Sequence, residues 1–224
     1  ETDTQEPFLE EGRLVYREGP SLSLDSEVIA TIAAPFSPHG GTKVLSGNLG
    51  RAVMKTSAVP HERQTLIAPA VVFDTQDDVE VAFKAGKLDR DCVVVVRYQG
   101  PKAIGMPELH KLMPPLGVLM DRGFNVALLT DGRLSGASGK VPAAIHVTPE
   151  AYVGGLLAKI EDGDLIRVDG ISGDISLLVE EAVLAQRQAI IPDLSASHLG
   201  MGRELFAALR ENITGAEQGA SCIG

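Results

Sequence analysis

The sequence predicts an α/β fold in which a mixed, barrel-like sheet is packed against outer helices. Apolar runs typical of strands alternate along the chain with segments of helical pattern, as in other α/β domains. Short strands and a hairpin interrupt this alternation, so a regular doubly wound sheet is not expected. The 224 residues, 44% of them hydrophobic, are enough to bury a sizeable core.

The expected strands are short apolar runs bounded by turn residues. The run at 93–96 is valine throughout, which is typical of a strand buried on both faces. A turn at 169–170 joins the last two strands. Together the expected strands lie at residues 28–33, 43–49, 70–73, 91–98, 125–130, 143–147, 164–168 and 175–179.

The expected helices begin at recognisable capping residues. A capping box at 75–78 opens a helix that should end near Lys84, with Gly86 beyond it. At 148–150, a threonine cap, a proline and an acid predict a helix running to about residue 160. Other helices are expected from Pro107 to residue 122, with an interruption at 114–115, and at 180–188 and 202–212.

Composition and charge exclude several classes of partner. The net charge of −10 disfavours nucleic acid and anionic membranes, and an anionic substrate would need a local positive site. No apolar stretch approaches the length of a membrane span and no signal peptide is apparent, so we expect a cytoplasmic protein. The two cysteines, Cys92 and Cys222, are too few to hold an iron–sulfur cluster.

The first 26 residues are polar and acidic, and they predict a linker or a strap over a neighbouring domain. The domain itself is expected at residues 27–224.

A glycine-rich loop at 131–140 is the strongest local feature. Successive backbone N–H groups in such a loop can bind an anion, and Arg133 and Lys140 add positive charge. The spacing fits neither a Walker A loop nor a nucleophile elbow. On the pattern alone, a structural turn and a substrate-binding loop both remain open.

A second feature, at 98–108, joins the buried valine strand to the expected helix start. An acid such as Glu108 is favoured at a helix N-terminus by the helix dipole, so a capping role and a metal-binding role remain open. The five histidines form no metal-binding pattern, and His146 ends an apolar strand, where a structural role is expected.

Taken together, the sequences at 100–108, 129–136 and 146–151 resemble the family of dihydroxy-acid and sugar-acid dehydratases. Further stretches at 108–115, 135–142, 191–196 and 215–220 resemble its phosphogluconate branch. The Ala103-Ile104 pair departs from the dihydroxy-acid form of the first motif, which also favours that branch.

The resemblance implies a swivelling β/β/α domain and a hydro-lyase reaction. The implied substrate is 6-phospho-D-gluconate, and the product is 2-dehydro-3-deoxy-6-phosphogluconate of the Entner–Doudoroff pathway. The implied cofactors are an iron–sulfur cluster and a divalent cation such as Mg²⁺. We expect the cluster to be bound by an N-terminal domain outside this chain, the cation to be shared between the domains, and the full-length protein to be a homodimer.

The resemblance also assigns roles to individual residues. Ser135 matches the serine proposed to remove the C2 proton, and Glu108 matches the metal ligand that this domain contributes. From the loop itself we expect substrate contacts from Arg133, Gly136, Ser138 and Lys140.

Two alternatives remain open. One is another sugar-acid or dihydroxy-acid dehydratase. The other, from a different class, is a swivelling phosphocarrier or small-molecule binding domain, in which His146 before the expected helix at 148–150 would carry the phosphate.

Overall fold

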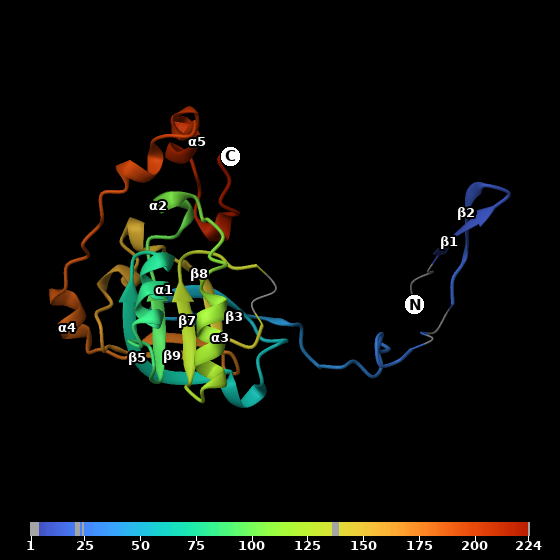
Figure 1. Ribbon diagram of the computed structural model, residues 1–224, viewed down its shortest axis with the longest axis horizontal. Helices are drawn as coiled ribbons and strands as arrows, with labels where there is room; N and C mark the ends of the chain where they lie inside the picture. The colour runs from blue at the N-terminus through green and yellow to red at the C-terminus, as the bar shows by residue number, and fades with distance from the viewer. Residues whose placement is uncertain (1–4, 21–22, 24, 136–138, 224) are drawn as a thin grey trace. The chain divides into compact units, whose positions relative to one another are not determined.

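The computed structural model describes residues 5–20, 23, 25–135 and 139–223, and the chain divides into two units, Glu1–Gly40 and Gly41–Gly224. In the first unit, β1 (Gln5–Glu10) and β2 (Arg13–Glu18) form an antiparallel hairpin (Figure 1). The strand expected at 28–33 is wrong. Val28 and Ile29 are exposed, and their backbone N–H groups donate to Asp25 O in a turn instead of to a neighbouring strand.

The second unit is built on a closed eight-stranded barrel with both parallel and antiparallel neighbours, which confirms the predicted fold class. Around the barrel the order is β10-β3-β4-β8-β7-β6-β5-β9. The strands are β3 (Thr42–Gly47), β4 (Gly50–Lys55), β5 (Thr65–Phe73), β6 (Cys92–Val96), β7 (Val126–Thr130), β8 (Ala143–Thr148), β9 (Leu165–Asp169) and β10 (Asp174–Leu177).

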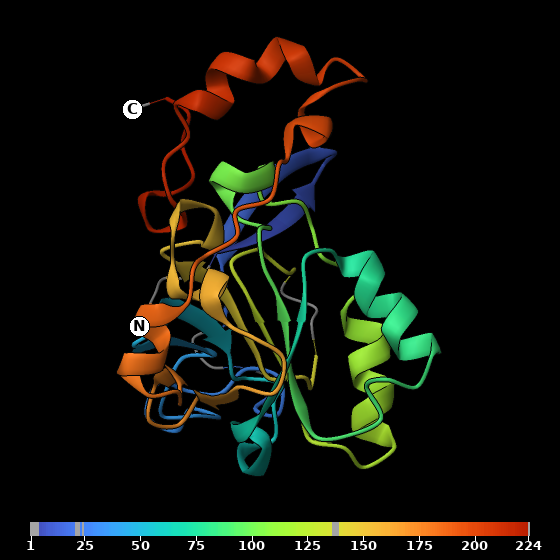
Figure 2. The same cartoon turned by 90° about the vertical axis from the view of Figure 1, so that its left-hand side faces the viewer.

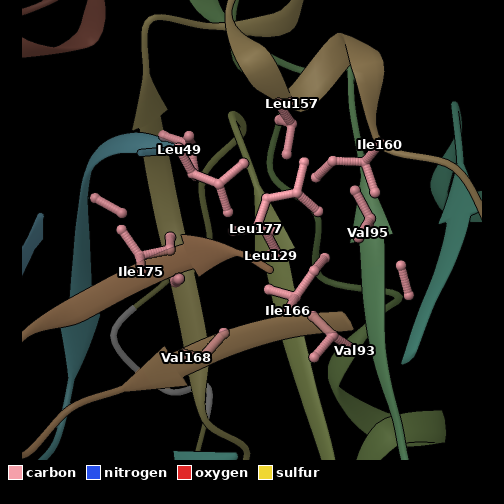
Figure 3. Close-up of a cluster of buried hydrophobic side chains, with 14 of the residues drawn as sticks. Leu49, Val93, Val95, Leu129, Leu157, Ile160, Ile166, Val168, Ile175 and Leu177 are labelled. Carbon is pink, nitrogen blue, oxygen red and sulfur yellow. The ribbon is translucent and has the colours of Figure 1, made fainter. Parts of the chain in front are cut away.

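Strands β5 to β8 are parallel neighbours, so their carboxyl ends meet at one end of the barrel. The barrel interior is filled by apolar side chains that point toward one another from these strands and from β9 and β10 (Figure 3). In the valine strand β6, alternate residues face opposite sides. Val93 and Val95 lie in this interior core, and Val94 and Val96 lie in a second core under the outer helices.

The outer core is covered by α1 (Gln76–Lys84) and α3 (Met113–Asp121). Helix α1 begins as predicted, because the Thr75 side chain accepts the Asp78 N–H. The remaining α-helices are α2 (Pro101–Ile104), α4 (Glu181–Gln186) and α5 (Ala207–Glu211). The described residues also form short 3-10 helices, which are η1 (His61–Arg63), η2 (Ala151–Val153), η3 (Leu156–Lys159), η4 (Ser195–His198), η5 (Arg203–Phe206) and η6 (Ala216–Gln218).

Two helix predictions are wrong. The helix expected from Pro107 begins only at Met113, where Pro114 occupies the first turn and its missing N–H costs no hydrogen bond. The helix expected after residue 148 is replaced by η2 and η3. The intervening Gly154, with φ of +89°, ends the first turn in the left-handed conformation.

Within the described part of the chain, no helix is both long and apolar enough to cross a membrane.

Candidate active site

The loops that follow β6 and β7 continue side by side beyond the ends of their strands. Glu108 and Arg133 form an isolated parallel bridge, and the Leu109 N–H donates to Arg133 O at 3.2 Å. This approach requires glycine at position 132, since a Cβ there would lie 2.7 Å from both Gln99 Cβ and Leu109 Cδ1. The sequence motifs at 98–108 and 131–140 therefore meet in one place.

The Glu108 carboxylate lies where the two loops meet and accepts hydrogen bonds from the loop after β7. The Arg133 side chain donates from Nη1 to Glu108 Oε2 at 2.9 Å and from Nε to Met106 O at 2.7 Å. The backbone N–H of Ser135 donates to Glu108 Oε1 at 2.5 Å. One carboxylate thus joins Arg133 and Ser135, which come from the same loop, to the loop after β6.

Beneath this contact, Asp131 ties three loops together from a fully buried position. Its Oδ1 accepts the N–H of Gln99 at 2.9 Å, and its Oδ2 accepts those of Tyr98 at 3.2 Å and Ala151 at 2.9 Å. Burial raises the pKa of Asp131 to about 6, although these backbone donors act in the opposite direction. The loops after β6, β7 and β8 share this one acceptor.

A second buried carboxyl group, Glu150, supports the loop after β6. It accepts the Lys102 N–H at 2.9 Å, at the start of α2. Gly100 allows this contact, because a Cβ at position 100 would lie 1.6 Å from Glu150 Oε2. Burial raises the pKa of Glu150 to about 7, and the charge of nearby Asp131 acts in the same direction. The pattern at 148–150 predicted Glu150 only as an acid in the first turn of a helix, and no role was expected for Asp131.

A cavity of about 450 Å³ lies beside this contact and along α3. Glu108, Ser135, Lys140 and His110 are among its lining residues. The pattern did not single out His110, although it falls in the stretch 108–115 that carries the phosphogluconate resemblance. Lys140 forms an ion pair with Asp121 at the end of α3, so the structure brings it to the cavity but not to Glu108.

Gly136 and Ser138, the other two expected substrate contacts, lie outside the described residues.

The described residues contain no cluster of three or more histidine, cysteine or acidic side chains able to hold a metal ion. Glu108 can still serve as a single ligand. Its side chain is 29% exposed, and a carboxylate has more acceptor positions than the two used here. Cys92 is buried in β6, and burial raises the pKa of its thiol to about 11, which disfavours the thiolate that binds metals.

His146 does not have the setting of a phosphocarrier. It lies within β8, half-buried, and 3-10 turns rather than an α-helix follow the strand. Burial and the neighbouring Arg133 lower the pKa of His146. This environment disfavours the phosphocarrier hypothesis.

The closed mixed barrel with outer helices is that of a swivelling β/β/α domain. The family described as Dihydroxy-acid/6-phosphogluconate dehydratase C-terminal matches residues 27–220, and the chain belongs to this family.

Among curated relatives, the chain is 73% identical to the Phosphogluconate dehydratase of Escherichia coli (strain K12), over 98% of this chain and 36% of the relative. It is 58% identical to the Phosphogluconate dehydratase of Pseudomonas aeruginosa, over 97% of this chain and 36% of the relative. Identity to the Dihydroxy-acid dehydratase of Wolinella succinogenes is 40%, over 74% of this chain and 30% of the relative. The chain thus spans about a third of the length of these relatives.

Proposed function

We propose that this chain is the C-terminal part of an enzyme that dehydrates 6-phospho-D-gluconate to 2-dehydro-3-deoxy-6-phosphogluconate in the cytoplasm. The observation that carries the proposal is the Glu108 carboxylate held between Arg133 and the Ser135 N–H beside an open cavity. The identities of 73% and 58% to phosphogluconate dehydratases, against 40% to a dihydroxy-acid dehydratase, support this substrate.

In this proposal Glu108 contributes one oxygen ligand to a divalent cation such as Mg²⁺, which prefers carboxylate oxygens. The other ligands and the cysteines of an iron–sulfur cluster belong to the N-terminal domain of the full-length protein. When bound, the cluster supplies a Lewis acid for the leaving 3-hydroxyl group, and the cation holds the carboxylate end of the substrate.

Ser135 removes the proton from C2 of the substrate. The deprotonated Ser135 Oγ takes the C2 proton, the C3–O bond breaks, and Ser135 returns this proton to the departing hydroxide, which leaves as water. The resulting enol moves its hydroxyl proton to C3 and becomes the 2-keto acid. A serine hydroxyl is a weak base in water, so it needs nearby positive charge. Because Glu108 holds the Ser135 backbone, the position of the base depends on the ligand carboxylate.

Positive charge on the cavity side of the loop suits an anionic substrate. We assign the substrate's charged groups to Arg133 and Lys140, with Gly136 and Ser138 as further contacts from the same loop. Lys140 lies at the cavity wall, where a phosphate could replace Asp121 as its partner. The acidic protein as a whole opposes anions, so such a local site is required.

The remaining proposals concern the whole protein. Residues 1–26 act as a linker or strap to the N-terminal domain, since the β1–β2 hairpin leaves Phe8, Leu9 and Tyr16 exposed. The full-length enzyme is a homodimer, and the isolated chain 1–224 is inactive because it lacks the cluster.

The test uses the full-length enzyme prepared without oxygen. Ser135→Ala should lower turnover by about 10²–10⁴-fold, because it removes the base, with iron and sulfide content unchanged. Glu108→Gln should lower turnover and also weaken Mn²⁺ binding measured by electron paramagnetic resonance, whereas Ser135→Ala should leave Mn²⁺ binding intact.

Full turnover by Ser135→Ala would contradict the role of the base, and unchanged Mn²⁺ binding by Glu108→Gln would contradict the role of the ligand. Faster dehydration of gluconate or of a branched dihydroxy acid than of 6-phosphogluconate would favour another dehydratase.

A further inference from the structure

The last part of the chain, residues 190–217, forms a segment that we call the C-terminal arch. It is fixed to the barrel at three places. The Tyr98 hydroxyl donates to Ile190 O at 2.7 Å, His198 Nε2 lies 3.3 Å from Ala103 O, and Arg51 pairs with Glu217 at 3.0 Å. Two of these contacts reach the loop after β6 that leads to Glu108. The arch thus borders the end of the barrel that carries the candidate site, with α5 beyond α2 (Figure 2).

Several apolar side chains of the C-terminal arch are exposed, although Leu194 packs against the interior core. Met201 is 96% and Leu205 is 84% exposed, and Leu199, Phe206 and Leu209 are also exposed. Short helical segments such as η5 and α5 gain most of their stability by packing an apolar face. Within the described residues 41–223 much of that face is left exposed, so a covering partner would stabilise the arch.

Three charged side chains near the apolar face of the arch bond the arch's own backbone. Arg203 donates to Leu199 O, Arg210 donates to Arg203 O, and Glu204 accepts the Gly200 N–H. These bonds engage the three charged groups within the arch, whereas the exposed apolar side chains beside them are left for a partner. The surface therefore suits a stable apolar interface rather than a charged one.

The identity of the partner follows from what the neighbouring site lacks. Glu108 is a single carboxylate ligand, and a second copy of this domain would add only another incomplete site. This chain covers 36% of the two phosphogluconate dehydratases, so nearly two thirds of each relative lies outside the matched region. That outside polypeptide must approach this end of the barrel to complete the site.

We propose that the C-terminal arch is the docking surface for the N-terminal part of the same polypeptide chain. The inference rests on the proposed function, in which that part completes the site at Glu108. Docking on the arch fixes the N-terminal part against α2 and the loop after β6, next to the residues that it must meet.

The test uses the full-length protein with a photo-crosslinking amino acid in place of Met201 or Leu205. A matched control carries it in place of Val81, which is 66% exposed on α1. After irradiation, denaturing electrophoresis separates crosslinks within one chain from crosslinks between two chains, and mass spectrometry identifies the joined peptides. We expect single-chain products that join position 201 or 205 to a peptide preceding residue 1, and none from position 81.

Products of doubled mass, products joined only within residues 41–224, or no product from positions 201 and 205 would each overturn the proposal. A second measurement uses Leu205→Asp, which should speed hydrogen exchange at residues 199–209 of the full-length protein about tenfold, because it opens the interface. Val81→Asp should not change this exchange, and equal effects of the two variants would also overturn the proposal. Neither readout requires turnover, so a different substrate would leave both results intact.

Discussion

Removing the Asp131 side chain is the sharpest test of how the candidate site is held together. Asp131→Ala deletes the single acceptor shared by the backbone N–H groups of Tyr98, Gln99 and Ala151. Asp131 is fully buried, so water does not readily replace the carboxylate. The variant separates the loops after β6, β7 and β8 without touching Glu108 or Ser135.

The magnitude follows from two opposing effects. Each buried donor left without an acceptor costs about 1–3 kcal/mol. Against this, the pKa of about 6 means that the native state holds the charged carboxylate at a cost of about 3 kcal/mol at pH 7, which the variant recovers. With about 2 kcal/mol for each of the three donors, we expect Asp131→Ala to lower the free energy of unfolding by about 3 kcal/mol at pH 7. Asp131→Asn should lower the free energy of unfolding less than Asp131→Ala does, because its amide oxygen can still accept backbone N–H groups on one side of the side chain.

Urea unfolding of the chain 1–224, followed by circular dichroism, measures the difference. The matched control is Asp91→Ala, which removes an exposed carboxylate that accepts the Asn125 N–H at 2.8 Å. This control should cost about 1 kcal/mol or less.

The pH dependence provides an independent check. Because the pKa of Asp131 is raised from 3.8 to about 6, the native state binds more protons than the unfolded state in this window. Stability from this group is therefore greatest below pH 4 and falls as the pH rises to 6. The loss caused by Asp131→Ala should grow by about 3 kcal/mol between pH 7 and pH 4. A loss independent of pH, or one no larger than that of Asp91→Ala, would refute the reasoning.

Three further predictions concern single contacts. Gly100→Ala should destabilise the chain by about 2–3 kcal/mol, because its Cβ would meet the buried Glu150 carboxylate, and thermal unfolding measures this. Lys140→Ala should lower kcat/KM of the full-length enzyme for 6-phosphogluconate about 10–100-fold, with gluconate turnover unchanged, because one charge-assisted bond to phosphate is lost. Arg187→Met should cost about 1–3 kcal/mol at pH 7, since it leaves the part-buried Asp164 without its charged partner. Burial raises the pKa of Asp164 but Arg187 more than offsets this, so the pKa is lowered and the loss should shrink as the pH falls below about 4.

Each of these predictions has a control. Gly117→Ala, where a new Cβ meets no atom within 4 Å, should be neutral or stabilising, and an equal loss at both glycines would contradict the steric argument. Equal loss of activity by Lys140→Ala on both substrates would exclude a phosphate contact. Arg17→Met removes an exposed ion pair and should change little, so a similar effect to Arg187→Met would show that burial is not the cause.

Most strands of the barrel could be predicted because parallel, fully buried strands are continuous apolar runs. This holds for β6 and β7, which are buried at every position. The sequence did not reveal β4 or the first half of β5. These pair antiparallel with β8 and β9, and their exposed and buried residues alternate in a weaker pattern. Their place in the barrel depends on partners distant in sequence.

In the candidate site, too, the local sequence predicted some features, whereas others depend on residues distant in sequence. The sequence pattern identified both loops, and the family resemblance marked Glu108 and Ser135. Neither indicated that the Glu108 carboxylate accepts the backbone N–H of Ser135. Asp131 and Glu150 act through backbone groups of loops distant in sequence, which no local pattern reveals. Within the arch, residues 202–212 were expected to form one amphipathic helix, but they form η5 and α5, and Leu205, Phe206 and Leu209 are exposed.

The closed barrel has a consequence for association between chains. Every barrel strand is paired on both sides, whereas the β1–β2 hairpin is a two-stranded sheet with both outer edges unpaired among the described residues. Unpaired edges are where strands from other molecules add, and they promote aggregation when left uncovered. Strand addition to this chain is therefore directed to the hairpin, and shortening the chain to begin at residue 41 would remove that edge while leaving the barrel complete.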